Sequence, residues 1–192
     1  MSGVIRLARR GDLAALVELE RAAGAVFRSV GMAAVADDEP PRLAELMAYQ
    51  QDARAWIAAD EADRPVGYLL VRVVDGNAHI EQVSIHPGHA GRRIGAALID
   101  TSAGWGRQHR LAALTLTTFA AVPWNAPYYR LLGFHVLTAN QLGPGLRRIR
   151  NEEAARGLDR WPRVAMHRLA RADPTARRPQ RIVCATTDRL AT

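Results

Sequence analysis

One segment, residues 80–98, constrains the fold of this chain most. It reads as a strand, then a short glycine-bearing loop, then a helix that carries Ile94 and Leu98 on one stripe. A nearly continuous apolar and β-branched run at residues 111–119 predicts a buried central strand after this helix. A strand–loop–helix unit followed by a buried strand indicates an α/β domain.

The rest of the hydrophobic pattern predicts further elements around this segment. Helices are expected from residue 12, from residue 40, over residues 125–132 and, as an insertion, over residues 152–157. Strands are expected at residues 4–7, 56–59, 66–74, 78–86, 134–137 and 164–166. The pattern contains no internal repeat, so we expect one domain over residues 1–170. Residues 171–192 carry five arginines against two aspartates and are predicted to form a flexible basic tail.

The net charge of +7 comes from a chain of 192 residues that contains arginine but no lysine. A basic balance suits nucleic acid, an anionic membrane or an anionic cofactor. The arginines are scattered, and no helix-turn-helix, zinc or aromatic RNA-binding signature is present, so we expect no nucleic-acid partner. No apolar run reaches the roughly 20 residues that a membrane span needs, so we expect no membrane partner.

Cysteine usage limits the redox and metal chemistry of the chain. Its single cysteine, Cys184, allows no internal disulfide, and no metal site with cysteine spacing exists. His79, His86 and His89 lie close in sequence but have no carboxylate or cysteine partner at a metal-ligand spacing, so no metal is expected. The N-terminus has no apolar signal core, which predicts a cytoplasmic protein.

The loop and helix start at residues 86–96 carry the first chemical signal. A glycine loop that leads into a helix N-terminus directs several backbone N–H groups at one point, and such a point binds phosphate. The loop has neither the Gly-Lys-Ser/Thr ending of a P-loop nor a dinucleotide fingerprint. Glycines before a helix also occur for steric reasons alone, so this signal needs a second one beside it.

A second motif at residues 122–134 provides that signal. Residues 90–95, with the sequence Ala-Gly-Arg-Arg-Ile-Gly, together with Asn125 and the Tyr-x-x-x-Gly-Phe run of residues 129–134, resemble the GNAT superfamily of N-acetyltransferases. The resemblance covers nearly all of the chain except the tail. Two positions depart from the family pattern: Ala90 replaces Gln or Arg, and Arg93 replaces Gly. Arg93 keeps its backbone N–H, and its side chain can contact a phosphate.

The resemblance implies a GNAT-like fold, with a mixed, partly splayed β-sheet flanked by helices, and acetyl-CoA as co-substrate. It implies that the pantetheine arm pairs with the exposed backbone of Val83, Ser84 and Ile85, and that Asn125 contacts the thiol end. It places the pyrophosphate on the backbone amides of Gly91, Arg92, Arg93, Ile94, Gly95 and Ala96.

Two side chains are candidate catalytic groups. Glu81 shares a strand face with Val83 and Ile85 unless a bulge resets the register, and a half-buried carboxylate in a cleft is a candidate base. The alternative for Glu81 is an exposed residue near the start of a strand. By the resemblance, Tyr129 occupies the position of the family's general acid, because it has the family's spacing to the Gly-Phe pair. The alternative for Tyr129 is a core tyrosine, and Tyr128 beside it is expected to pack or to line the acceptor site.

These observations predict an acetyl-CoA-dependent N-acetyltransferase that acts on the amine of a small molecule by direct transfer. Two alternatives stay open: a protein or peptide N-acetyltransferase, and a non-catalytic acyl-CoA sensor. A homodimer also stays open.

Overall fold

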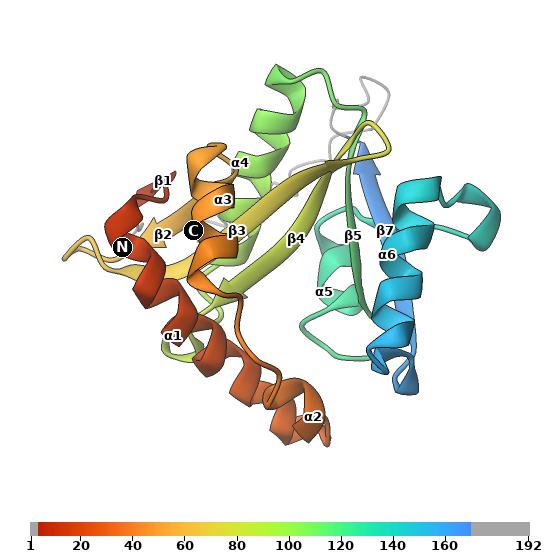
Figure 1. The fold of residues 1–192 in the computed structure, drawn as a ribbon, viewed down its shortest axis with the longest axis horizontal. Coiled ribbons are helices and arrows are strands. Elements are labelled where there is room, and N and C mark those ends of the chain that lie inside the picture. Colours follow the sequence, from red (N-terminus) through yellow and green to blue (C-terminus); the bar gives the residue numbers. More distant parts are fainter. Residues whose placement is uncertain (1–3, 170–192) are drawn as a thin grey trace, which may run out of the picture.

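A computed structural model describes residues 4–169, which form a seven-stranded mixed sheet with helices on both faces (Figure 1). The strands are β1 (Val4–Leu7), β2 (Ala55–Ala59), β3 (Pro65–Val74), β4 (Asn77–Ile85), β5 (Ala113–Phe119), β6 (His135–Val136) and β7 (Arg163–Leu169). The helices are α1 (Leu13–Ala25), α2 (Ala33–Ala36), α3 (Leu43–Gln51), α4 (Ile94–Gln108), α5 (Ala126–Leu131) and α6 (Pro144–Ala155). The tail predicted at residues 171–192 lies outside the described residues.

The sheet opens between β4 and β5. Its order is β1-β2-β3-β4-β5-β7-β6, and β4 with β5 is the parallel pair. In the described part of the chain these two strands pair only where Ala78 meets Leu114 and His79 meets Thr115. Beyond that point β4 continues to Ile85 and β5 to Phe119 without pairing to each other, and Figure 1 shows them diverging. The predicted mixed, partly splayed sheet is confirmed.

Two apolar cores lie on opposite faces of this sheet, because successive strand side chains point to opposite sides. On β3, Tyr68 and Leu70 pack toward α1 and α3, whereas Leu69 and Val71 pack toward α4. In Figure 1, α1, α3 and α6 lie in front of the sheet and α4 and α5 lie behind it. Burial on both faces explains why β3 reads as a continuous apolar run rather than as an alternating one.

A β-bulge interrupts β4. Leu70 pairs with Gln82 and Val71 pairs with Ile80, so Glu81 is an extra residue with no partner on β3. A bulge bends its strand and redirects the neighbouring side chains. Here it lets Ile80 and Val83, three residues apart, both pack on the back core beside α4.

Helix α6 is longer than predicted, and residues 24–35, expected as a loop with irregular helix, are mostly helical. The segment at residues 24–35, which has small residues and no clear period, forms the end of α1, a 3-10 turn (Val26–Val30) and the start of α2. Helix α6 begins at Pro144 rather than at residue 152. Leu146 and Ile149 bury its one apolar stripe, and the arginines between them hide this period in the sequence. Among the described helices, none is both long and apolar enough to cross a membrane.

Candidate functional site

The open edge of β4 presents backbone hydrogen-bonding groups toward the gap. The His86 N–H donates to the Val66 carbonyl at 2.9 Å, and the Val71 N–H donates to the carbonyl of Arg54, which directly precedes β2 on the other side of β3. Backbone groups alternate along a strand, so Gln82, Ser84 and His86 pair with β3, whereas Val83 and Ile85 point toward β5. This corrects the expectation that the backbone of Ser84 is exposed together with its neighbours. An extended ligand in the gap can add to β4 as a strand through Val83 and Ile85.

The N-terminus of α4 lies after the loop that follows this edge. Helix α4 starts at Ile94, and its cap residue Arg93 makes no side-chain capping hydrogen bond. The first amides of a helix have no intrahelical partner, so they are available to an anion. Gly91 and Arg93 both have positive φ, 75° and 60°. The family pattern has glycine where this chain has Arg93, and the left-handed conformation explains that preference.

Tyr128 lies against this helix start. A Cβ at Gly95 would come 3.4 Å from the Tyr128 hydroxyl, so the absence of a side chain at Gly95 makes room for it. Burial raises the pKa of Tyr128, and a hydrogen bond from the Ala96 backbone offsets part of that shift. The Tyr128 hydroxyl therefore lies at the first turn of α4, where it occupies the Ala96 amide.

Asn125 lies just after β5 and holds one unpaired polar atom. Its Nδ2 donates to Thr118 Oγ1 at 2.6 Å, which ties the side chain back to β5. Its Oδ1 is buried and accepts a hydrogen bond from no described residue. A buried acceptor without a donor costs about 1–3 kcal/mol, so this atom fits a site where a ligand supplies the N–H or S–H.

Tyr129 belongs to the back core on α5. Its side chain is 9% exposed, and its ring packs edge-on against Phe134 and at a tilt to Tyr128. Burial raises the pKa of Tyr129 well above its ordinary value, and Tyr128 adds to the shift. The phenol is therefore protonated at neutral pH and is a donor.

Glu81 lies on the front face, not on the back face with Val83 and Ile85. Its Oε2 is 2.6 Å from Arg72 Nε, and Arg72 follows Leu70 on the face covered by α1 and α3. The bulge is the physical reason, because it resets the strand register at this residue. The side chain is 36% exposed, so a ligand can reach it. Partial burial raises the pKa of Glu81, and the Arg72 cation offsets part of that shift.

Glu20 on α1 is a site residue that the sequence analysis missed. Its carboxylate accepts hydrogen bonds from the Tyr68 hydroxyl at 2.6 Å, the Ser84 hydroxyl at 2.6 Å and the Gln82 amide at 2.8 Å. Ser84 and Gln82 flank Val83, so Glu20 holds the front of β4 at the open edge. The sequence does contain a signal for Glu20, because this residue follows Leu16 by four positions and therefore lies on the buried stripe of its helix.

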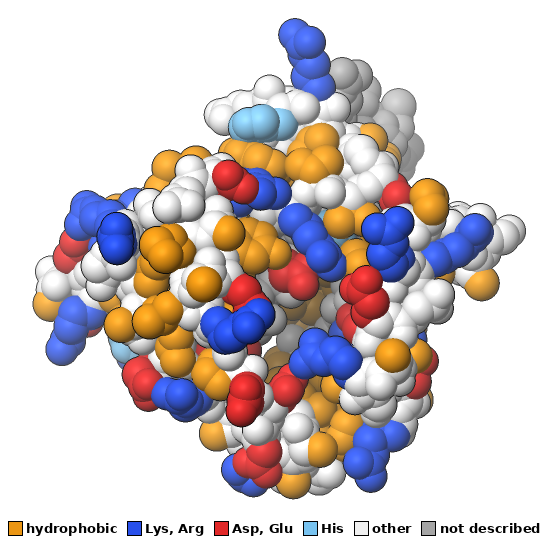
Figure 2. Space-filling model, viewed as in Figure 1, with side chains coloured by type: hydrophobic (Ala, Val, Ile, Leu, Met, Phe, Trp, Pro, Cys, Tyr) orange, Lys and Arg blue, Asp and Glu red, His pale blue; other side chains and the backbone are white. Residues whose placement is uncertain are grey.

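Charged side chains surround the front of the gap. Glu153 on α6 is hydrogen-bonded to Thr117 of β5 and paired with Arg150 and Arg163. Asp38, in the segment after α2, is 2.7 Å from Arg156 at the end of α6. Figure 2, in the same view as Figure 1, shows a hollow near the centre of this face with charged side chains of both signs around it.

No group of three or more histidine, cysteine or acidic residues in the described part of the chain is arranged to hold a metal ion. His79 is buried between sheet and helices, where its Nδ1 lies 3.0 Å from Thr115 Oγ1. Burial lowers the pKa of His79 to about 4, so it is neutral at physiological pH.

Comparison with known proteins agrees with this geometry. Residues 16–134 match the model of the acetyltransferase (GNAT) family. The chain superimposes on a GNAT-family acetyltransferase from Staphylococcus aureus Mu50 with a TM-score of 0.67 at 14% identity, covering 88% of this chain and 99% of that one. A phosphinothricin acetyltransferase from Sinorhizobium meliloti, in complex with AcCoA, gives a TM-score of 0.62 at 21% identity over 96% and 97% of the two chains. The ribosomal-protein-S18-alanine N-acetyltransferase of Escherichia coli gives 0.59 at 15% identity over 92% and 99%.

Proposed function

Because the chain belongs to the acetyltransferase (GNAT) family, we propose that it transfers an acetyl group from acetyl-CoA to the amine of a small molecule. The observation that carries the proposal is the open edge of β4, with the backbone of Val83 and Ile85 unpaired toward β5. A strand edge of this kind beside a helix N-terminus whose N-cap side chain makes no capping hydrogen bond suits a ligand with an extended amide-bearing arm and a phosphate group. The Sinorhizobium meliloti relative was solved with AcCoA, which supports the choice of donor.

The residues present fit the pyrophosphate, the pantetheine arm and the thiol end of acetyl-CoA. The pyrophosphate would bind the amides of the first turn of α4 and the loop before it, with the arginine side chains of that loop adding charge. The pantetheine arm would pair with Val83 and Ile85. The unpaired Oδ1 of Asn125 would accept a hydrogen bond at the thiol end. The amides at the pyrophosphate would be those of Gly91, Arg92, Arg93, Ile94 and Gly95, because the Ala96 amide, also expected there, already donates to the Tyr128 hydroxyl.

Acetyl-CoA supplies a thioester whose carbonyl carbon bonds to the amine nitrogen as the bond to sulfur breaks. The Val83 N–H points into the gap and would donate to the carbonyl oxygen as it gains negative charge. An alkyl amine has a pKa of about 10.4, so deprotonating it at pH 7 costs about 4.6 kcal/mol. Glu81 would accept that proton, directly or through water, and Tyr129 would donate one to the departing sulfur.

The entrance to the gap favours a small acceptor over a peptide. The ion pair between Asp38 and Arg156 links the segment after α2 to α6 across the front face. An extended peptide would have to displace it, whereas a small amine would not. The Escherichia coli relative acts on a ribosomal-protein alanine, so peptides belong in the test.

A panel of alkyl amines, polyamines and N-terminal peptides, with release of free thiol as the signal, tests the proposed function. Turnover with small amines supports it. Turnover with peptides alone would replace it by peptide acetylation, and tight acetyl-CoA binding without turnover on any amine would replace it by acyl-CoA sensing.

Replacing Arg93 by glycine should separate stability from cofactor binding. The left-handed conformation costs a non-glycine residue roughly 1–2 kcal/mol, so Arg93→Gly should raise Tm by about 2–8 °C. Loss of a charge-assisted contact to phosphate should weaken acetyl-CoA binding by about tenfold or more. Thermal unfolding and calorimetric titration measure the two effects.

Arg110 offers the matched control, because it is also an arginine with positive φ, 58°, but lies after the other end of α4. Arg110→Gly should give the same rise in Tm with an unchanged acetyl-CoA affinity. Equal acetyl-CoA affinities for both variants would remove Arg93 from the phosphate site.

A further inference from the structure

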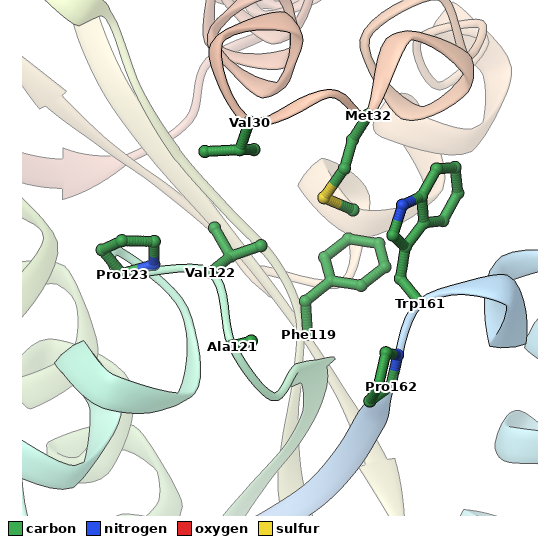
Figure 3. A pocket seen from close by; sticks show the side chains of 8 residues that line it. All are labelled: Val30, Met32, Phe119, Ala121, Val122, Pro123, Trp161 and Pro162. Atoms are coloured by element: carbon green, nitrogen blue, oxygen red, sulfur yellow. The ribbon is translucent and has the colours of Figure 1, made fainter.

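An apolar pocket with a volume of about 260 Å³ lies beside the open end of the sheet. Three segments of the chain form it: the turn before α2, the end of β5 with the loop after it, and the two residues before β7 (Figure 3). All of its described lining residues are apolar, namely Val30, Met32, Phe119, Ala121, Val122, Pro123, Trp161 and Pro162. Figure 3 shows the side chains of Met32, Phe119 and Val122 directed toward one another across it.

The pocket shares its wall with the candidate acetyl-transfer site. Phe119 directly follows Thr118, whose hydroxyl accepts the hydrogen bond from Asn125 Nδ2 at 2.6 Å. The Asn125 backbone N–H donates to the Val122 carbonyl at 2.9 Å. The loop after β5 therefore contributes Val122 to the pocket and Asn125 to the candidate acetyl-transfer site. The pocket therefore adjoins the loop that holds Asn125.

The lining excludes one class of acceptor and favours another. An ammonium group placed among these side chains would lose its hydration and gain no counter-charge, which is unfavourable. An engineered apolar cavity of about 150 Å³ holds benzene, so this larger pocket holds an aromatic ring or a branched aliphatic group. Met32, Phe119 and Val122 are already buried around it, so little reorganisation is needed.

We infer that the acceptor is an amine that carries an apolar group, and that this pocket binds the group and sets acceptor specificity. The inference rests on the proposed function. Polyamines and diamines are poor acceptors, because their second ammonium group would have to enter the pocket.

A homologous series of straight-chain amines tests this specificity, since the amine pKa stays nearly constant while the apolar group grows. Each methylene that enters the pocket should raise kcat/KM about fourfold, up to the length that fills it. Ethylamine, butylamine and hexylamine form the series. 1,6-Diaminohexane, which replaces the far end of hexylamine by an ammonium group, should fall at least tenfold below hexylamine.

Filling the pocket with a larger side chain should abolish the preference for longer alkyl amines. Val30 is 40% exposed and lines the pocket, so Val30→Trp can occupy the space without disturbing the buried core. The ratio of kcat/KM for hexylamine to that for ethylamine should fall by tenfold or more. Val136 is the matched control, because it is also a valine with 40% exposure and lies on β6, so Val136→Trp should keep the wild-type ratio.

The outcomes separate the two claims. A flat alkylamine series with measurable turnover, or a ratio that Val30→Trp leaves unchanged, overturns the pocket's role and leaves the acetyltransferase proposal standing. Acetyl-CoA that is never consumed with any amine overturns both. A rising series that collapses only in Val30→Trp supports both.

Discussion

Tyr129→Phe should lower kcat by about 10²- to 10⁴-fold, the usual contribution of a positioned general acid. The substitution removes one oxygen and keeps the ring, which packs against Phe134 in the back core. Stability should therefore change little. Acetyl-CoA affinity should also change little, because the phenol is proposed to act on the sulfur only as its bond to carbon breaks. Steady-state kinetics with saturating acetyl-CoA, combined with a calorimetric Kd, measures both quantities.

Tyr128→Phe is the internal control for this result. The Tyr128 hydroxyl lies at the first turn of α4, so its loss should affect acetyl-CoA binding more than kcat. The two adjacent tyrosines thus predict opposite patterns of kcat and Kd. A normal kcat for Tyr129→Phe together with a low kcat for Tyr128→Phe would reverse their roles.

Glu81→Gln should lower kcat/KM by about 10²-fold at pH 7 and change the shape of the pH profile. The free-amine fraction alone makes log kcat/KM rise with a slope of one below the amine pKa. The raised pKa of Glu81 adds a second unit of slope below that pKa, where the carboxyl is protonated and cannot accept a proton. Glutamine never titrates, so the variant should keep a slope of one throughout the acidic range.

Arg72→Gln provides the second arm of this test. The Arg72 cation lowers the pKa of Glu81, so its removal should raise that pKa and move the break in the profile to higher pH. Glu20→Gln should leave the break where it is, because Glu20 accepts its hydrogen bonds from neutral groups away from Arg72. If the break in the pH profile moved in Glu20→Gln but not in Arg72→Gln, the general base would be Glu20 and not Glu81.

Local patterns predicted the α/β class, the family and the order of strands and helices around the site. The strand at residues 78–86, the glycine loop and the helix after it each have a strong local signal, and β4 and α4 formed close to those bounds. Helix α6 and the helical turns at residues 24–35 were harder to predict. Arginines and alanines obscure their period, and their helical structure depends on packing against distant residues.

The side-chain environment of Glu81 could not be predicted from the sequence. A bulge is set by the pairing of two strands, so the face on which Glu81 lies depends on the register between β3 and β4. The contacts of Glu20 with Ser84 and of Asp38 with Arg156 join residues far apart in the chain. No single-sequence pattern contains such contacts. Asn125, in contrast, was identified from its motif. The structure adds that its Oδ1 is buried and unpaired, which makes it a possible acceptor for a ligand N–H or S–H.

The most direct test of the acetyltransferase proposal is the stoichiometry of one reaction. The full chain is incubated with acetyl-CoA and hexylamine, and free CoA and N-acetylhexylamine are both quantified by mass spectrometry. The account predicts that the two products appear in a one-to-one ratio and that Tyr129→Phe slows both equally. Free CoA without acetylated amine, or no consumption of acetyl-CoA with any amine of the series, would contradict it.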